Sequence, residues 1–237
     1  FLRSPKSIIS ATSLAAIIFQ SNQNEQHGGQ AFGAFDTDLA PYVVLEYNKQ
    51  RKKITDTLSD FCGNTEFDED KINAAAWENT RKATFQAMEA LVHNLNTMHS
   101  RAGAQVPFTS INFGMDTTRE GRLISEMLLL AFEKGLGKNE QPLFPILIFS
   151  VKKGINFEPD APNYDLLRLS MRVSATRLYP NYCFQDCSLN NDAPMYKLLP
   201  RMGCRTEIGY DVNLPADKQT YEGRGNLSFT TINLPHI

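Results

Sequence analysis

The sequence predicts an α/β fold with parallel strands that are covered on both faces. Two segments, 106–113 and 145–151, carry apolar side chains at consecutive positions, which is typical of strands buried on both sides. A helical pattern at about 119–132 separates them, another at about 164–178 follows, and 182–184 is a third candidate strand. We therefore expect a helical region at 1–102 followed by an α/β region at 103–237.

Three helices are expected in the N-terminal region. Ser4 and Pro5 are typical of an N-cap and a first helical residue, so a first helix is expected at 6–20; it is too short to span a bilayer. Asp38 is expected to cap a second helix at 39–61, with Pro41 in its first turn. A third helix is expected at 70–100 and closed by Gly103. Large apolar residues recur along it at helical spacing, which indicates a core or a helix–helix seam: Trp77, Phe85, Met88, Leu91, Leu95 and Met98.

The polar stretch 21–30 follows the first helix. It contains several amide side chains together with His27, Gly28 and Gly29. Ordering such a stretch costs conformational entropy, and this cost is offset only if its side chains bind a ligand or one another. His27 is therefore a candidate donor to a phosphate, and the alternative is that it holds the backbone of its own loop.

Ser110 and Asn112 lie two positions apart on the first predicted strand, and so on one of its faces. This pair suits hydrogen bonding to a ribose, and it could equally satisfy neighbouring backbone groups.

Cys204 is the candidate reactive residue. Pro200 and Gly203 predict a loop here, and Arg201 and Arg205 flank the thiol. Nearby guanidinium groups favour the thiolate, which is the reactive form of cysteine. The alternative is a small buried core cysteine. A strand is expected to follow at 230–232.

Composition limits the class of protein. A net charge of −2 and a pI near 6.1 give no electrostatic case for binding nucleic acid or a membrane. Four scattered cysteines are too few for a disulfide scaffold and favour a reducing cytoplasm. Cys183 and Cys187 have no second pair with which to hold zinc, so we predict core thiols and no metal site; Cys62 has no assigned role.

Four segments together resemble one family. They are 21–30 (SNQNEQHGGQ), 101–114 (RAGAQVPFTSINFG), 144–152 (FPILIFSVK) and 199–206 (LPRMGCRT). In this order they resemble the anaerobic, class III ribonucleoside-triphosphate reductases, which are glycyl-radical enzymes, and the resemblance runs over 1–237.

The resemblance implies a partial catalytic domain. Residues 103–237 would form the first part of a ten-stranded α/β barrel, with a finger loop at about 199–208 in its centre. The helices of 1–102 would form the region for dimer contacts and effector binding. Because the chain opens on Phe1 and lacks the family's glycyl-radical motif and four-cysteine zinc site, we expect an internal fragment that is inactive alone.

The resemblance also implies the chemistry. A thiyl radical on Cys204 would remove the 3′ hydrogen of a ribonucleoside triphosphate, the 2′ hydroxyl would leave as water, and a deoxyribonucleoside triphosphate would form. Asn226 would orient substrate or formate, although it could be an ordinary turn residue at a strand entry. The candidate substrate contacts are Ser110, Asn112, His27, Gly28 and Gly29.

The implied cofactors and partners lie outside this chain. They are a glycyl radical, a radical-SAM activase with an iron–sulfur cluster that installs it, ATP and deoxynucleotide effectors, formate as reductant, and a second copy in a homodimer. Two alternatives remain from the sequence. One is a different glycyl-radical enzyme, similar to formate acetyltransferase, and the other is a non-catalytic module for nucleotide binding or dimerisation.

Overall fold

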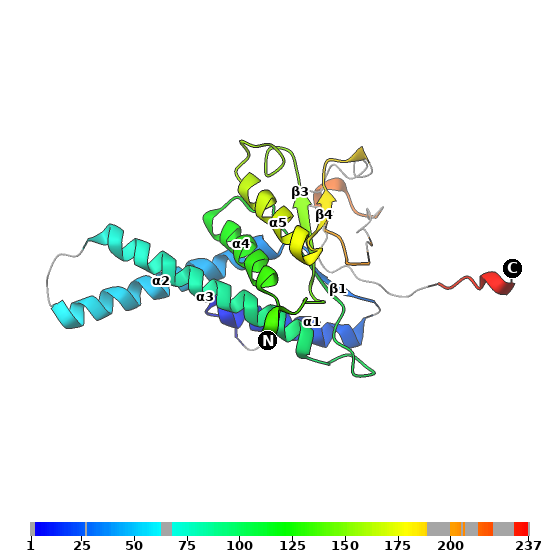
Figure 1. The fold of residues 1–237 in the computed structure, drawn as a ribbon, viewed down its shortest axis with the longest axis horizontal. Coiled ribbons are helices and arrows are strands. Elements are labelled where there is room, and N and C mark those ends of the chain that lie inside the picture. Colours follow the sequence, from blue (N-terminus) through cyan, green and yellow to red (C-terminus); the bar gives the residue numbers. More distant parts are fainter. Residues whose placement is uncertain are drawn as a thin grey trace.

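The computed structural model describes residues 3–26, 28–62, 68–188, 200–204, 206, 213–219 and 230–236. Within these ranges, five α-helices accompany one parallel sheet of four strands in the order β1-β2-β3-β4. Figure 1 shows the helices gathered on one side of the strands, while the described segments 200–204 and 213–219 lie on the other. The predicted α/β class is therefore confirmed, and the closed ten-stranded barrel stays a prediction.

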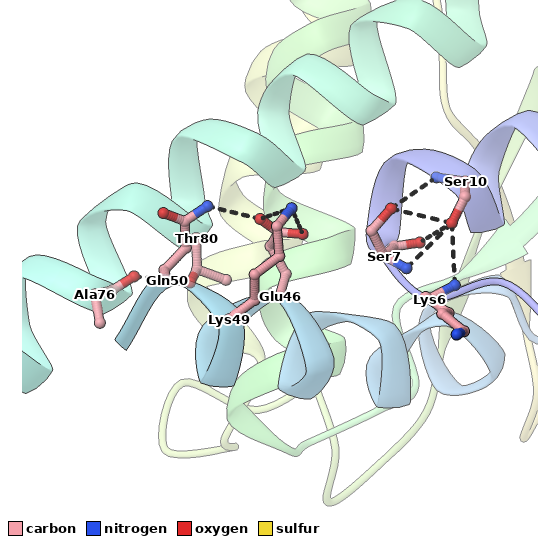
Figure 2. Close-up of polar contacts among 8 residues, drawn as sticks. All are labelled: Lys6, Ser7, Ser10, Glu46, Lys49, Gln50, Ala76 and Thr80. Carbon is pink, nitrogen blue, oxygen red and sulfur yellow. Dashed lines mark hydrogen bonds and ion pairs between the residues drawn. The ribbon is translucent and has the colours of Figure 1, made fainter. Parts of the chain in front are cut away.

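Helix α1 spans Ile8–Glu25 and begins with a capping box. The hydroxyl of Ser7 accepts from the backbone N–H of Ser10 at 3.2 Å, and the hydroxyl of Ser10 accepts from the N–H of Ser7 at 3.1 Å (Figure 2). The start expected at Ser4 and Pro5 is therefore wrong, because this reciprocal pair satisfies the free N–H groups one turn later.

Helices α2 (Phe35–Cys62) and α3 (Glu69–Thr97) pack as a long hairpin that projects beyond the rest of the molecule (Figure 1). The N–H of Asp38 donates to the carbonyl of Ala34 at 2.9 Å, so Asp38 lies inside α2 and is not its cap. Pro41 also lies inside the helix rather than in its first turn. At the buried side of α2, the carboxylate of Glu46 accepts from Gln50 at 2.7 Å (Figure 2).

The predicted apolar seam of α3 is buried at Met88, Leu91 and Leu95, whereas Met98 is exposed. Asp68 caps this helix by accepting from two backbone N–H groups. Gly103 does not close it, because α3 ends at Thr97 and Gly103 lies in a later turn with φ of 78°. None of the described helices is both long and apolar enough to cross a membrane.

The four strands are β1 (Gln30–Phe32), β2 (Thr109–Phe113), β3 (Ile146–Val151) and β4 (Asn181–Phe184). The connections after β2 and β3 contain α4 (Arg119–Lys134) and α5 (Tyr164–Arg177), as the sequence predicts. β1 was not expected, because it has only three residues and begins at the end of a polar stretch. The strand expected at 230–232 is wrong: these residues are exposed and irregular, and no described strand pairs with them.

β2 and β3 are buried along their whole length, which confirms that both faces are covered. Alternate side chains divide between the two faces. One set packs into the core with the helices: Ile111, Phe113, Leu147, Phe149 and Val151. The register Ser110↔Ile146 and Asn112↔Ile148 places the other set on the opposite face, which we call the loop face. This face carries the candidate site.

Candidate active site

The segment 200–204 with Thr206, which we call the thiol loop, rests on the loop face of the sheet. The N–H of Arg201 donates to Oδ1 of Asn112 at 2.8 Å, and Nδ2 of Asn112 donates to the carbonyl of Arg201 at 2.8 Å. One side chain thus pairs both backbone groups of a loop residue, as a neighbouring strand would.

Gly203 makes the second contact between loop and sheet. Its N–H donates to Oγ of Ser110 at 2.6 Å. A Cβ built at Gly203 would lie 2.5 Å from Cδ1 of Ile146, closer than real atoms approach. A Cβ here would require Ile146 to move, so glycine at this position lets the loop approach the sheet closely.

Cys204 follows this anchored residue directly, and its side chain is exposed. The N–H of Met202 donates to the carbonyl of Thr206 at 3.2 Å and closes the turn. Sγ of Cys204 lies 3.1 Å from Oγ1 of Thr206. The alternative of a buried core cysteine is wrong, because the turn presents the thiol outward. Arg205 lies outside the described residues, so the expected pair of flanking guanidinium groups is untested.

Ser110 and Asn112 share the loop face, as predicted, and both are fully buried. The second amide hydrogen of Asn112 goes to the carbonyl of Phe32 in β1 at 2.9 Å. Both donor hydrogens of this amide are therefore committed to backbone carbonyls. Contact with a ribose stays a prediction for both residues.

The carboxyl end of β2 is held by Asp36 at the start of α2. Its Oδ2 accepts from the N–H groups of Gly114, Met115 and Asp116 at 2.8, 3.0 and 3.0 Å. Complete burial raises the pKa of Asp36, and this effect outweighs the hydrogen bonds that lower it. No motif in the sequence singled out this residue. The only sign of it in the sequence was a carboxylate beside the start of a helix, and a carboxylate there usually caps the helix.

Two buried asparagines complete this support. Asn156 donates to the carbonyl of Gly114 at 3.0 Å and to that of Ser150 at 2.8 Å. Asn163 donates to the carbonyl of Asp116 at 2.8 Å. The carboxyl ends of β2 and β3 are thus fixed by side-chain amides, and no motif in the sequence predicted them.

The polar stretch partly binds itself. Nε2 of Gln23 donates to the carbonyl of Gly28 at 2.6 Å. Gly29 packs against Phe108, where a Cβ would lie 2.7 Å from the ring. Gly28 and Gly29 thus lie at the entry to β1. His27 and Asn226 fall outside the described residues, so their predicted roles are untested.

Cys183 and Cys187 differ in how far they are buried. Cys183 is buried on the loop face, as expected of a core thiol. Cys187 is only half-buried and lines a small cavity with Lys152, Lys153 and Phe184, so its expected core position is wrong. In the part of the chain that the structure describes, no three His, Cys, Asp or Glu side chains gather in a group that could hold a metal.

These features define a parallel α/β protein that presents a thiol on a loop bonded to its sheet. The chain belongs to the anaerobic ribonucleoside-triphosphate reductases, an oxidoreductase family whose model matches residues 1–237. The reductase of Escherichia coli (strain K12) is 33% identical over 98% of this chain, and that of Enterobacteria phage T4 is 32% identical over all of it. The chain spans 31% and 37% of the length of these relatives.

Proposed function

We propose that this chain is part of the catalytic domain of an anaerobic ribonucleoside-triphosphate reductase. Residues 1–102 would form its dimer and effector region, and 103–237 the first part of a ten-stranded barrel with its finger loop at about 199–208. The observation that carries the proposal is the exposed thiol of Cys204 on a loop bonded to buried side chains of the sheet. The family match over the whole chain supports it.

In the proposed reaction, Cys204 would receive the unpaired electron from a glycyl radical elsewhere in the longer protein. Cys204, as a thiyl radical, takes the 3′ hydrogen atom of the ribose and becomes a thiol. The 2′ hydroxyl leaves as water with one added proton. Formate would be oxidised to carbon dioxide, and its two electrons together with one proton would place a hydrogen on the 2′ carbon. Cys204 would then return a hydrogen atom to the 3′ carbon. The product is a deoxyribonucleoside triphosphate.

This chemistry demands a fixed thiol. Reacting atoms must be held at about 3–3.5 Å in an aligned geometry, because small displacements cost large factors in rate. The hydrogen bonds from Arg201 and Gly203 to the sheet support this requirement, because they hold the backbone next to Cys204. In the complete protein, the surroundings of this exposed thiol must also exclude water and oxygen, which would divert the radical.

The other site residues have proposed roles. Asn226 would orient substrate or formate, and His27, Gly28 and Gly29 would contact the nucleotide. Ser110 and Asn112 are candidates for ribose contacts, in addition to the loop contacts described above. The proposed partners are the radical-SAM activase with its iron–sulfur cluster, ATP and deoxynucleotide effectors, and a second copy of the protein, all in the cytoplasm.

The test compares Cys204→Ser with the unchanged enzyme in the complete protein. The anaerobic assay would contain the activase, ATP, formate and CTP. We expect a normal glycyl-radical signal in electron paramagnetic resonance and no deoxynucleotide from Cys204→Ser. Cys187→Ser is the matched control, since that thiol lies at the separate cavity, and it should remain active. Reduction of CTP by Cys204→Ser would refute the assignment.

A second candidate function is a non-catalytic module for dimerisation or nucleotide binding. Exposed apolar side chains on α2, among them Val44 and Leu45, favour an intermolecular contact there. Deoxynucleotide binding without binding of ribonucleotide substrate would support this function. The family match favours the reductase over enzymes similar to formate acetyltransferase.

A further inference from the structure

The thiol loop and strand β2 meet in a regular pattern. Ser110 bonds Gly203, and Asn112 bonds Arg201. Ser110 and Asn112 are two positions apart on the strand. Their partners on the loop are also two positions apart, but the order along the chain is reversed. The loop therefore runs across the side chains of β2 in the opposite direction to the strand.

The two side chains fix different groups of the loop. Asn112 holds both the N–H and the carbonyl of Arg201, which fixes the orientation of that residue and its register along the strand. Ser110 holds the N–H of Gly203, the residue that precedes Cys204. Because both side chains are fully buried, water competes poorly for these bonds.

We infer that Ser110 and Asn112 are positioning residues for the thiol of Cys204, acting through the backbone of Arg201 and Gly203. The catalytic consequence rests on the proposed function, whereas the anchoring itself does not. This role differs from substrate binding. Removing a residue that positions the thiol lowers the rate of the chemical step, while removing a residue that binds the ribose in the ground state raises KM.

The first test measures the anchor directly. In the chain labelled with ¹⁵N-glycine, the Gly203 amide is one of 14 glycine signals and is assigned by its loss in Gly203→Ala. We expect its hydrogen exchange to become about two- to tenfold faster in Ser110→Ala, the range for one hydrogen bond. Ser110→Thr restores a hydroxyl acceptor and should restore slow exchange.

Ser150→Ala is the matched control for this measurement. Ser150 is also a fully buried serine on the loop face, in β3, but its hydroxyl accepts from Gln185 rather than from the thiol loop. This variant should leave Gly203 exchange unchanged. Unchanged exchange in Ser110→Ala would overturn the inference.

The second test measures kinetics in the complete, activated protein. We expect Ser110→Ala to lower kcat by about two- to tenfold with KM unchanged, and Ser110→Thr to recover kcat. A raised KM with kcat retained would overturn the positioning role in favour of ribose binding. If Cys204→Ser proves active, the proposed function fails, and the exchange measurement still decides whether Ser110 anchors the loop.

Discussion

The side-chain amide of Asn112 pairs with both backbone groups of Arg201, each at 2.8 Å. The same amide bonds the carbonyl of Phe32 at 2.9 Å, so one buried side chain joins β1, β2 and the thiol loop. A residue in this position contributes to the stability of the fold as well as to the geometry of the site.

Asn112→Ala should therefore destabilise the protein. The change removes three hydrogen bonds and leaves the carbonyls of Phe32 and Arg201 without this donor, at an expected cost of about 2–4 kcal/mol. Urea unfolding followed by circular dichroism measures it. Asn24→Ala is the control, since Asn24 is exposed and bonds the carbonyl of Ser100 across the fold. A cost equal to the control's would show that Asn112 does not hold these elements together.

Gly203→Ala should displace the loop from the sheet. The added methyl group would overlap Cδ1 of Ile146, and overpacking of this kind costs about 1–3 kcal/mol. Ile146→Val removes that Cδ1 atom, so the double variant should regain part of the loss in a double-mutant cycle. At Gly137 a Cβ would meet no atom within 4 Å, so Gly137→Ala should be nearly neutral. Strict additivity of Gly203→Ala and Ile146→Val would rule out the proposed clash.

Asp36 should give stability a distinct dependence on pH. Burial raises its folded-state pKa above the ordinary value of 3.8. The folded protein therefore binds this proton more tightly than the unfolded chain does. The resulting stability is fully present below 3.8 and is lost as pH rises through the folded pKa.

The reference for this prediction is Asp36→Asn, which cannot titrate and keeps one oxygen acceptor. Relative to that variant, the free energy of unfolding of the unchanged protein should fall as pH rises from about 4 and then level off. Denaturant titrations at a series of pH values measure the difference. If the difference in unfolding free energy grows with pH instead, the three backbone hydrogen bonds, and not burial, control the pKa of this carboxyl.

Local patterns in the sequence predicted most of the fold. The apolar runs of β2 and β3 and the helical spacing in α3 and α4 identified these elements to within a few residues, because the core requires that spacing. β1 was missed because it has three residues and one large apolar side chain, Phe32. The start of α1 was misplaced because serine occurs at both Ser4 and Ser7, and only the partner Ser10 decides between them.

The site was predicted less completely. The spacing of Ser110 and Asn112 placed them on one face, and the loop character of the cysteine segment was evident from Pro200 and Gly203. Ser110 bonds Gly203, which is 93 positions away, and Asn112 bonds Arg201, which is 89 positions away. No local pattern in the sequence encodes contacts over such separations. The role of Asp36 was hidden for the same reason, since its partners in the turn after β2 are 78 to 80 positions away.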